Sequence, residues 1–186
     1  MGDTINSEWN EGAACFSPEA DVLYFTSSRK IAKDNQGTKI FAVQRQEDGW
    51  GGVAQLDLVP DSLSVGHPSI SADGNILYFV SDMPGGYGGN DIWMAKKSGS
   101  SWNEPQNMGR PINSPNNELF PFIKNNGDLF FASDRKEGMG GLDIYQAKRQ
   151  ETGVWKVENM KYPINSTADD FAMVFQTGQE KGMFTS

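Results

Sequence analysis

The sequence predicts an all-β fold, a β-propeller segment with three complete four-stranded blades and a partial fourth, as part of a larger propeller. The main observation is an internal repeat in which a short run of aromatic and β-branched residues ends in a serine. The closing serines lie 54, 52 and 53 residues apart, at Ser27, Ser81, Ser133 and Ser186. No stretch of roughly 11 or more residues shows the apolar period of a helix. Units of this length that lack helices are typical of propeller blades.

Four strands are expected in each unit, because short apolar runs alternate with turn residues. In the second unit, Asp73-Gly74 predicts the first turn, and the glycine-rich segment 83–90 joins the second strand to the third. The first and third units follow the same plan. The strands expected in the second unit cover about 67–71, 76–81, 91–97 and 102–108.

Two further landmarks recur in the units, an x-Ile-aromatic triplet in the third strand and a tryptophan in the fourth. The triplets are Lys39-Ile40-Phe41, Asp91-Ile92-Trp93 and Asp143-Ile144-Tyr145. The tryptophans are Trp50, Trp102 and Trp155. We expect these tryptophans to pack between blades, and core packing is also favoured for Trp9, which lies outside the repeat.

The joints between units carry Ile-Asn-Ser, at Ile5-Asn6-Ser7, Ile112-Asn113-Ser114 and Ile164-Asn165-Ser166. They predict blades at about 5–60, 61–112 and 113–164, with a partial blade at 165–186. Each small sheet has two apolar faces that only neighbouring sheets can cover. We therefore expect missing blades or another chain to pair with the open ends.

Composition excludes several function classes. A net charge of −8 with scattered Lys and Arg argues against nucleic-acid binding, and no apolar stretch reaches the roughly 20 residues that direct membrane insertion needs. Cys15 is the only cysteine and His67 the only histidine, so an internal disulfide and a Cys/His zinc site of usual spacing are excluded. Every candidate carboxylate pair recurs with the repeat, and we therefore predict no catalytic residue and no enzyme activity.

The repeat motifs resemble those of a known family. The segments Leu77-Tyr78-Phe79-Val80-Ser81-Asp82 and Gly88-Gly89-Asn90-Asp91-Ile92-Trp93 resemble the TolB-type WD-like propeller repeat. The Gly-Gly-x-Asp-Ile-Tyr loop with a Pro-Ile-Asn-Ser joint is similar to the propeller of OmpA-family cell-envelope proteins of Gram-negative bacteria, including PorE-like components of the type IX secretion system. This resemblance implies a periplasmic, outer-membrane-associated module with envelope proteins as partners. The first unit departs from the pattern, with Lys39 in place of the aspartate and no glycine-rich loop.

Paired aspartates flank the glycine-rich loops, and two interpretations of them exist. Clustered carboxylates with free loop carbonyls are what Ca²⁺ needs, which makes Asp82, Asp91, Asp134 and Asp143 candidate ligands. Aspartates also cap tight loops through Asx-turns, and glycines supply the positive φ of a hairpin. The sequence favours this structural interpretation, and we predict no cofactor.

Residues that differ between units are better guides to a binding face than those that repeat. The loops 29–38, 83–90 and 135–141 are expected on one side of the disc, where basic, aromatic and Met side chains would contact a protein. The candidate partner-binding residues are Arg29, Lys33, Tyr87, Arg135, Lys136 and Met139.

The resulting functional prediction is a non-catalytic interaction or scaffold propeller of the Gram-negative cell envelope, in a secretion or outer-membrane-associated complex. One alternative is a propeller that binds glycan or peptidoglycan fragments, with aromatic and polar residues at the channel mouth. Another is an accessory propeller of a peptidase, although the chain has no Gly-x-Ser-x-Gly nucleophile motif. Fold alone does not separate these functions.

Overall fold

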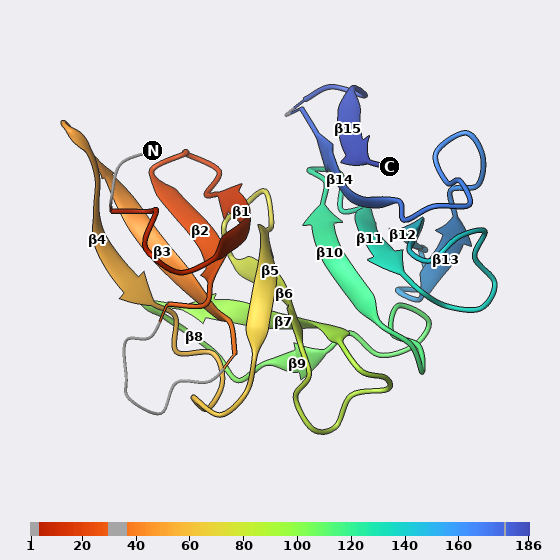
Figure 1. The fold of residues 1–186 in the computed structure, drawn as a ribbon, viewed down its shortest axis with the longest axis horizontal. Coiled ribbons are helices and arrows are strands. Elements are labelled where there is room, and N and C mark those ends of the chain that lie inside the picture. Colours follow the sequence, from red (N-terminus) through yellow and green to blue (C-terminus); the bar gives the residue numbers. More distant parts are fainter. Residues whose placement is uncertain (1–3, 30–36, 177) are drawn as a thin grey trace.

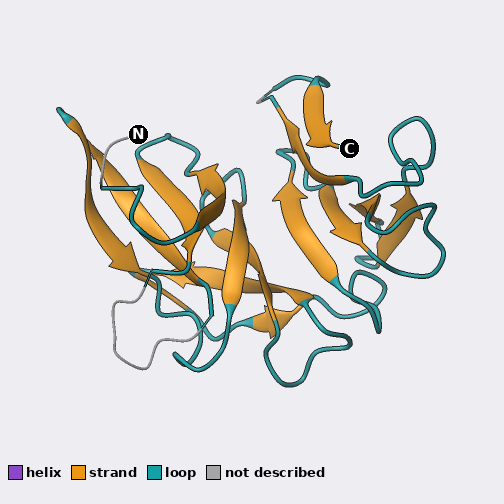
Figure 2. Ribbon diagram, viewed as in Figure 1, coloured by secondary structure: helices purple, strands orange, loops and turns teal. Residues whose placement is uncertain are grey.

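A computed structural model describes residues 4–29, 37–176 and 178–186. Within these residues the chain forms strands, turns and loops, arranged as four antiparallel sheets that follow one another along the chain (Figures 1 and 2). None of the described segments is a helix long and apolar enough to cross a membrane. The all-β propeller architecture predicted from the repeat is confirmed.

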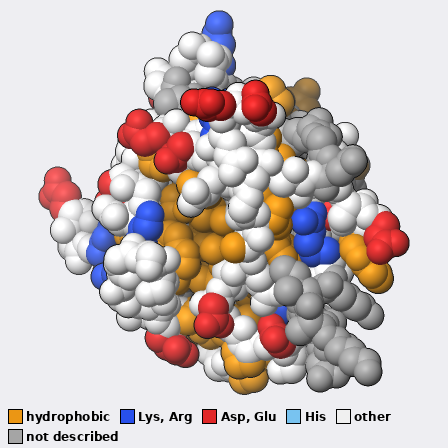
Figure 3. Space-filling view, turned by 90° about the vertical axis from the view of Figure 1, so that its left-hand side faces the viewer, with side chains coloured by type: hydrophobic (Ala, Val, Ile, Leu, Met, Phe, Trp, Pro, Cys, Tyr) orange, Lys and Arg blue, Asp and Glu red, His pale blue; other side chains and the backbone are white. Residues whose placement is uncertain are grey.

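The first sheet contains four strands in sequential order, each paired with the next. They are β1 (Glu11–Phe16), β2 (Val22–Ser27), β3 (Lys39–Gln46) and β4 (Gly49–Gln55). This sheet forms one end of the molecule, and hydrophobic side chains gather near the centre of that end (Figure 3). Its apolar cluster contains Ile5, Leu23, Phe25, Phe41 and Val43, with Trp50 and Val53 packed against it.

The second sheet follows the same plan except at its outer edge. It consists of β5 (Val65–Ile70), β6 (Ile76–Ser81), β7 (Asp91–Ser98), β8 (Ser101–Trp102) and β9 (Gln106–Asn107). The single outer strand expected over 102–108 is wrong, because β8 and β9 pair with β7 as two separate pieces. Pro105 lies between these pieces and has no backbone N–H to donate to the ladder.

The third sheet is complete and the fourth contains two strands. The third consists of β10 (Glu118–Ile123), β11 (Leu129–Ser133), β12 (Asp143–Arg149) and β13 (Trp155–Asn159). The fourth consists of β14 (Phe171–Phe175) and β15 (Gly182–Thr185). The first strands of successive sheets contact one another, β1 with β5, β5 with β10, and β10 with β14. These four strands are therefore the innermost ones.

In the second strand of a sheet, alternate side chains pack against the two neighbouring sheets. In β6, Leu77 and Phe79 join the cluster shared with the first sheet, whereas Tyr78 joins the cluster shared with the third. The ring of Tyr24 in the first sheet meets Trp102 of the second edge-on, with centroids 6.4 Å apart. Burying a large apolar side chain stabilises a fold by about 1.5–3 kcal/mol, so these faces hold neighbouring sheets together.

The joint asparagines Asn113 and Asn165 tie the third and fourth sheets to the sheet before each of them. The Asn113 side chain accepts a hydrogen bond from the Ile92 N–H and donates one to the Ile92 carbonyl, both at 2.9 Å. Asn165 makes the same pair of bonds with Ile144, at 2.8 and 2.9 Å. Both asparagines are buried, and their amides therefore explain why Ile-Asn-Ser recurs at the joints.

The glycine-rich loops also cross between sheets. The Gly89 N–H donates to the Asn116 carbonyl at 3.1 Å, and Glu118 N–H donates to the Asn90 carbonyl at 2.7 Å. A Cβ on Gly88 would lie 1.9 Å from the Asn116 carbonyl oxygen, and one on Gly140 would lie 2.0 Å from that of Ala168. The glycines thus allow one backbone to approach the next sheet closely.

We expect Gly88→Ala to lower the free energy of unfolding by about 1–3 kcal/mol, because the added methyl group meets backbone atoms that cannot rotate away. Urea denaturation followed by circular dichroism measures this loss. The matched control is Gly12→Ala, whose Cβ would make only an ordinary contact with Thr26 at 4.0 Å. Equal stabilities of the two variants would contradict this role of Gly88.

Candidate functional site

The glycine-rich loops of the second and third sheets present one exposed side chain each at equivalent positions. The buried carboxylate of Asp91 accepts a hydrogen bond from the Tyr87 N–H. That of Asp143 accepts one from the Met139 N–H at 2.8 Å. Tyr87 and Met139 are each 46% exposed. Two different large side chains are therefore held by the same backbone geometry on adjacent loops.

The other predicted contact residues divide into two groups. Lys136 is exposed and belongs to the same third-sheet loop as Met139. Arg29 and Arg135 are instead largely enclosed, with 13% and 12% of their side chains exposed. Lys33 lies outside the described residues. The role of these residues in partner binding stays a prediction.

Arg29 and Arg135 belong to a repeated polar cluster that sequence reasoning missed. Arg135 pairs with the fully buried Glu118 at 3.0 Å, and the Ser133 hydroxyl donates to the same carboxylate oxygen at 2.9 Å. In the first sheet, Arg29 and Glu11 form the equivalent pair at 3.0 Å. The closing serines of the first three repeats, Ser27, Ser81 and Ser133, are thus buried hydrogen-bonding groups. The signal available was the matching order of Glu, closing serine and Arg in the first and third units.

Hydrogen bonds lower the pKa of Glu11 in the first sheet. Burial alone would raise the pKa of Glu11, but hydrogen bonds from Ser7, Ser27 and Arg29 outweigh it and lower that pKa to about 2. The carboxylate therefore stays ionised at neutral pH and balances the guanidinium group.

The four candidate calcium ligands accept hydrogen bonds from backbone N–H groups in different parts of the chain. Asp82 accepts a hydrogen bond from the Ser64 N–H at 3.2 Å, and Asp134 accepts one from the Asn117 N–H at 2.7 Å. Asp91 and Asp143 instead hold the glycine-rich loops. No group of three or more His, Cys, Asp or Glu side chains among the described residues could hold a metal ion. The placement of these aspartates lends no support to the calcium interpretation.

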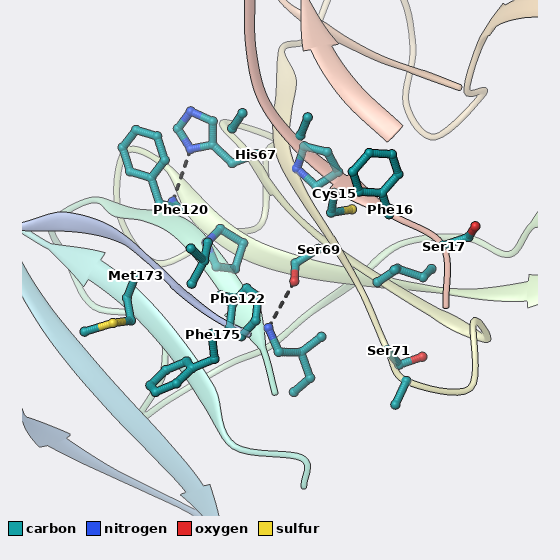
Figure 4. Close-up of a pocket in the computed structure, with 18 of the residues that line it drawn as sticks. Cys15, Phe16, Ser17, His67, Ser69, Ser71, Phe120, Phe122, Met173 and Phe175 are labelled. Carbon is teal, nitrogen blue, oxygen red and sulfur yellow. Dashed lines mark hydrogen bonds between the residues drawn. The ribbon is translucent and has the colours of Figure 1, made fainter. Parts of the chain in front are cut away.

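A cavity of about 670 Å³ lies where the four innermost strands meet (Figure 4). Its walls come from β1, β5, β10 and β14 and from the turns that follow three of these strands. None of its lining residues is Asp, Glu, Lys or Arg. The aromatic part of the lining consists of Phe16, His67, Phe120, Phe122 and Phe175. The cavity therefore suits an uncharged occupant.

Bulges in the innermost strands aim side chains at this cavity. The pairing register of β5, β10 and β14 with the next strand shifts within each strand. His67, Phe120 and Ala172 occupy the same bulge position, with φ values of 51°, 50° and 56°. Such left-handed conformations are uncommon for residues other than glycine, and bulges typically redirect a side chain.

The His67 ring stacks on Phe120, with centroids 4.0 Å apart and 12° between the planes. Its Nδ1 accepts a hydrogen bond from the Phe120 N–H at 3.2 Å (Figure 4). Burial lowers the pKa of His67 to about 4, so the ring is neutral at pH 7 and can accept this bond. The sequence predicted that His67 begins the first strand of its unit, over about 67–71, but gave no hint of Phe120 as its neighbour.

Burial raises the pKa of the Cys15 thiol to about 12, although a backbone hydrogen bond at Ile70 lowers it, and the thiol is therefore protonated and unreactive at neutral pH. Trp9, for which core packing was expected, is 42% exposed, and that expectation is wrong.

Comparisons with known proteins identify the fold. No protein-family model matches the chain, and no curated protein matches its sequence. The structure is similar to TolB from Acinetobacter baumannii, with a TM-score of 0.59 and 14% identity over 97% of this chain and 41% of that chain. The chain thus spans less than half the length of that TolB.

Two hydrolases have comparable similarity. A puromycin-hydrolyzing peptidase from Mycobacterium tuberculosis matches with a TM-score of 0.54 and 16% identity over 84% of this chain and 23% of that chain. An endo-arabinase from Bacteroides thetaiotaomicron matches with a TM-score of 0.55 and 17% identity over 88% of this chain and 65% of that chain. At such identities the likeness shows the fold alone, which is a β-propeller.

We expect protonation of His67 to destabilise the fold as the pH falls from about 6.5 to about 4. The folded-state pKa lies below the ordinary value of 6.5, so the unfolded chain takes up the proton first, and stability is complete only above that value. The loss attributable to His67 is about 2–3 kcal/mol. It is measured as the difference between wild type and His67→Asn in urea denaturation at several pH values. Parallel pH profiles would contradict it.

Proposed function

We propose that this chain is a non-catalytic propeller module of the Gram-negative cell envelope that binds a protein partner through its glycine-rich rim. The rim is defined as Tyr87, Lys136 and Met139 with the loops that carry them. The observation that supports this proposal most directly is the equivalent placement of Tyr87 and Met139. Both are large and exposed, and each is fixed through its backbone by a buried aspartate.

The rigidity of these loops favours tight binding. Ordering a flexible loop costs free energy on association, whereas these loops are already held by hydrogen bonds within and between sheets. Tyr and Met are also enriched in the buried centres of protein interfaces. The Arg110 guanidinium lies 5.5 Å from the Tyr87 ring centroid and adds a polar contact at the same place.

The location in the envelope rests on the repeat motifs. The loop that contains Asp143-Ile144-Tyr145 and the joint that contains Ile164-Asn165-Ser166 resemble those of OmpA-family envelope proteins. The fold similarity to TolB is compatible with the same assignment. We therefore place the module in the periplasm, near the outer membrane, in an assembly such as a secretion complex.

A second candidate function is binding of a glycan fragment in the central cavity. It is favoured by the aromatic lining, which includes Phe120 and Phe122, and by the polar side chains of Ser17, Ser71 and Asn125 elsewhere in the lining. Calorimetry with peptidoglycan fragments tests this function, and Phe120→Ala would weaken binding if the sugar stacks there.

We expect a photo-crosslinking residue at position 87 or 139 to capture the same envelope protein from a Gram-negative periplasmic extract. A crosslinker at position 154 is the matched control, because Val154 is 61% exposed but lies in the turn between β12 and β13. Substituting both Tyr87 and Met139 by Ala is expected to lower capture about tenfold or more, as loss of interface anchors does.

The folded state of each variant is checked by circular dichroism before capture is compared. Equal labelling from positions 87, 139 and 154, or no specific product from either rim position, would overturn the proposed rim.

A further inference from the structure

The outer edge of β15 is an unpaired edge of a β-sheet. β15 pairs with β14 on one side, and no strand of the described residues pairs with it on the other (Figure 1). In each of the first three sheets the second strand, β2, β6 or β11, lies between two neighbours and is buried along almost its whole length. In β15, by contrast, every residue except Phe184 is exposed. Such an edge leaves backbone N–H and C=O groups open to pairing with another strand.

The strand that would pair with this edge has the same register in all three complete sheets. The closing serine lies opposite the first residue of the x-Ile-aromatic triplet, and the two residues before the serine lie opposite the isoleucine and the aromatic residue. The aromatic residues Phe41, Trp93 and Tyr145 face Phe25, Phe79 and Phe131, respectively. Transferred to the fourth sheet, this register places an isoleucine opposite Thr185 and an aromatic residue opposite Phe184.

The fourth sheet already holds the side chains against which that aromatic residue would pack. In the third sheet, Tyr145 shares an apolar cluster with Ile112 and Phe131, both of which are fully buried. The equivalent residues one repeat later are Ile164 and Phe184. They pack against the cluster between the third and fourth sheets but are only partly buried. Covering them with an aromatic ring removes apolar area from water, which favours binding.

Two further positions of the pairing strand differ in how much they restrict the side chain. The residue opposite Gly182 corresponds to the fully or almost fully buried Val43, Ala95 and Ala147. The residue opposite Met183 corresponds to the partly buried Ala42, Met94 and Gln146. The first position therefore requires a small apolar side chain, whereas the second accepts different chemistries. The sequence pattern that fits the edge is Ile-aromatic-x-Ala or Ile-aromatic-x-Val.

The strands of this chain that carry the pattern are not free to pair with β15 of a second copy. β3 lies between β2 and β4, and β12 lies between β11 and β13. β7 pairs with β6 on one side and with β8 and β9 on the other. Releasing any of them would break a complete sheet. A strand from a different polypeptide is the occupant that leaves the existing sheets intact.

We propose that the free edge of β15 binds an extended strand of a partner polypeptide, antiparallel to β15, with the pattern Ile-aromatic-x-Ala or Ile-aromatic-x-Val. The bound strand becomes the third strand of the fourth sheet. Its backbone supplies ladder hydrogen bonds, and its aromatic side chain covers Phe184 and Ile164 and provides the specificity. This inference goes beyond the proposed function, because it concerns a surface that includes none of the rim residues and does not depend on them.

The probe is the peptide acetyl-Asp-Ile-Tyr-Gln-Ala-Lys-Arg-amide, which has the sequence of β12. It is titrated into the ¹⁵N-labelled chain and followed by NMR. We expect the shifted amide signals to belong to β14, β15 and the joint at Ile164. A peptide with Tyr replaced by Ala is expected to bind about tenfold more weakly, as loss of an interface anchor does. A scrambled peptide of the same composition and charge is the control, and equal binding of the scrambled peptide would overturn the proposal.

The orientation of the bound peptide is tested with a nitroxide label at either end. The antiparallel register predicts that a label at the amino end broadens the signals of Thr185 and Ser186, whereas one at the carboxyl end broadens those of Lys181 and Gly182. The same broadening from both labels, or the reverse pattern, would contradict the predicted strand pairing.

Phe184→Ala is expected to lower the affinity for the peptide about fivefold or more, because it removes a side chain that the tyrosine covers. Met183→Ala is the matched control and should change the affinity less than about twofold, since neighbouring side chains of a strand point to opposite faces. Unchanged amide signals of the third sheet show that each variant is folded. The peptide without tyrosine tests the same contact in the unaltered chain, even where Phe184→Ala disturbs the fourth sheet.

The chain alone is also measured over a range of concentrations by NMR and light scattering. Signals of β15 that do not depend on concentration are expected. Signals of β15 that shift as a dimer forms would show that a second copy occupies the edge, and they would overturn the assignment to a partner strand.

Discussion

The side-chain amides of Asn113 and Asn165 set how one sheet meets the next. Each forms hydrogen bonds with both the N–H and the carbonyl of an isoleucine in the preceding sheet. Because a sheet cannot slide without breaking this pair of bonds, the apolar faces between sheets meet in one register. The rim loops inherit their positions from that register, since their glycines lie against the same joint segments. The central cavity depends on it too, because its walls are one strand from each sheet.

The joint between the first and second sheets is held by a lysine side chain and not by an asparagine. Leu63 stands where the other joints have asparagine, and the buried Lys39 ammonium donates to the carbonyls of Pro60 and Leu63. Burial lowers the pKa of Lys39, and these carbonyls compensate part of its lost hydration. The polar cluster changes as well, with Val65 and Met83 in place of the carboxylate and the arginine. Lys39 and its two carbonyl partners thus stand where the other two joints have the aspartate and the asparagine.

The repeat alone sufficed to predict the sheets, because strand periodicity and turn residues are local properties of the sequence. The bulges at His67 and Phe120 were not predicted, since a left-handed residue in a strand leaves no mark in an apolar pattern. The ion pair of Arg135 with Glu118 joins residues that meet only when β10 pairs with β11. The division of the outer strand at Pro105 could have been read from the missing N–H.

The shared bulge of the innermost strands has a consequence for how this architecture diversifies. His67, Phe120 and Ala172 are an imidazole, an aromatic ring and a methyl group at one geometric position. Their side chains project from a distortion that the neighbouring strand already accommodates, so exchange at this position leaves the sheet ladders intact. The lining of the central cavity can therefore differ at one position in each of the last three sheets. Single substitutions at these positions can change the side chains that line the cavity while the strand pairing stays the same.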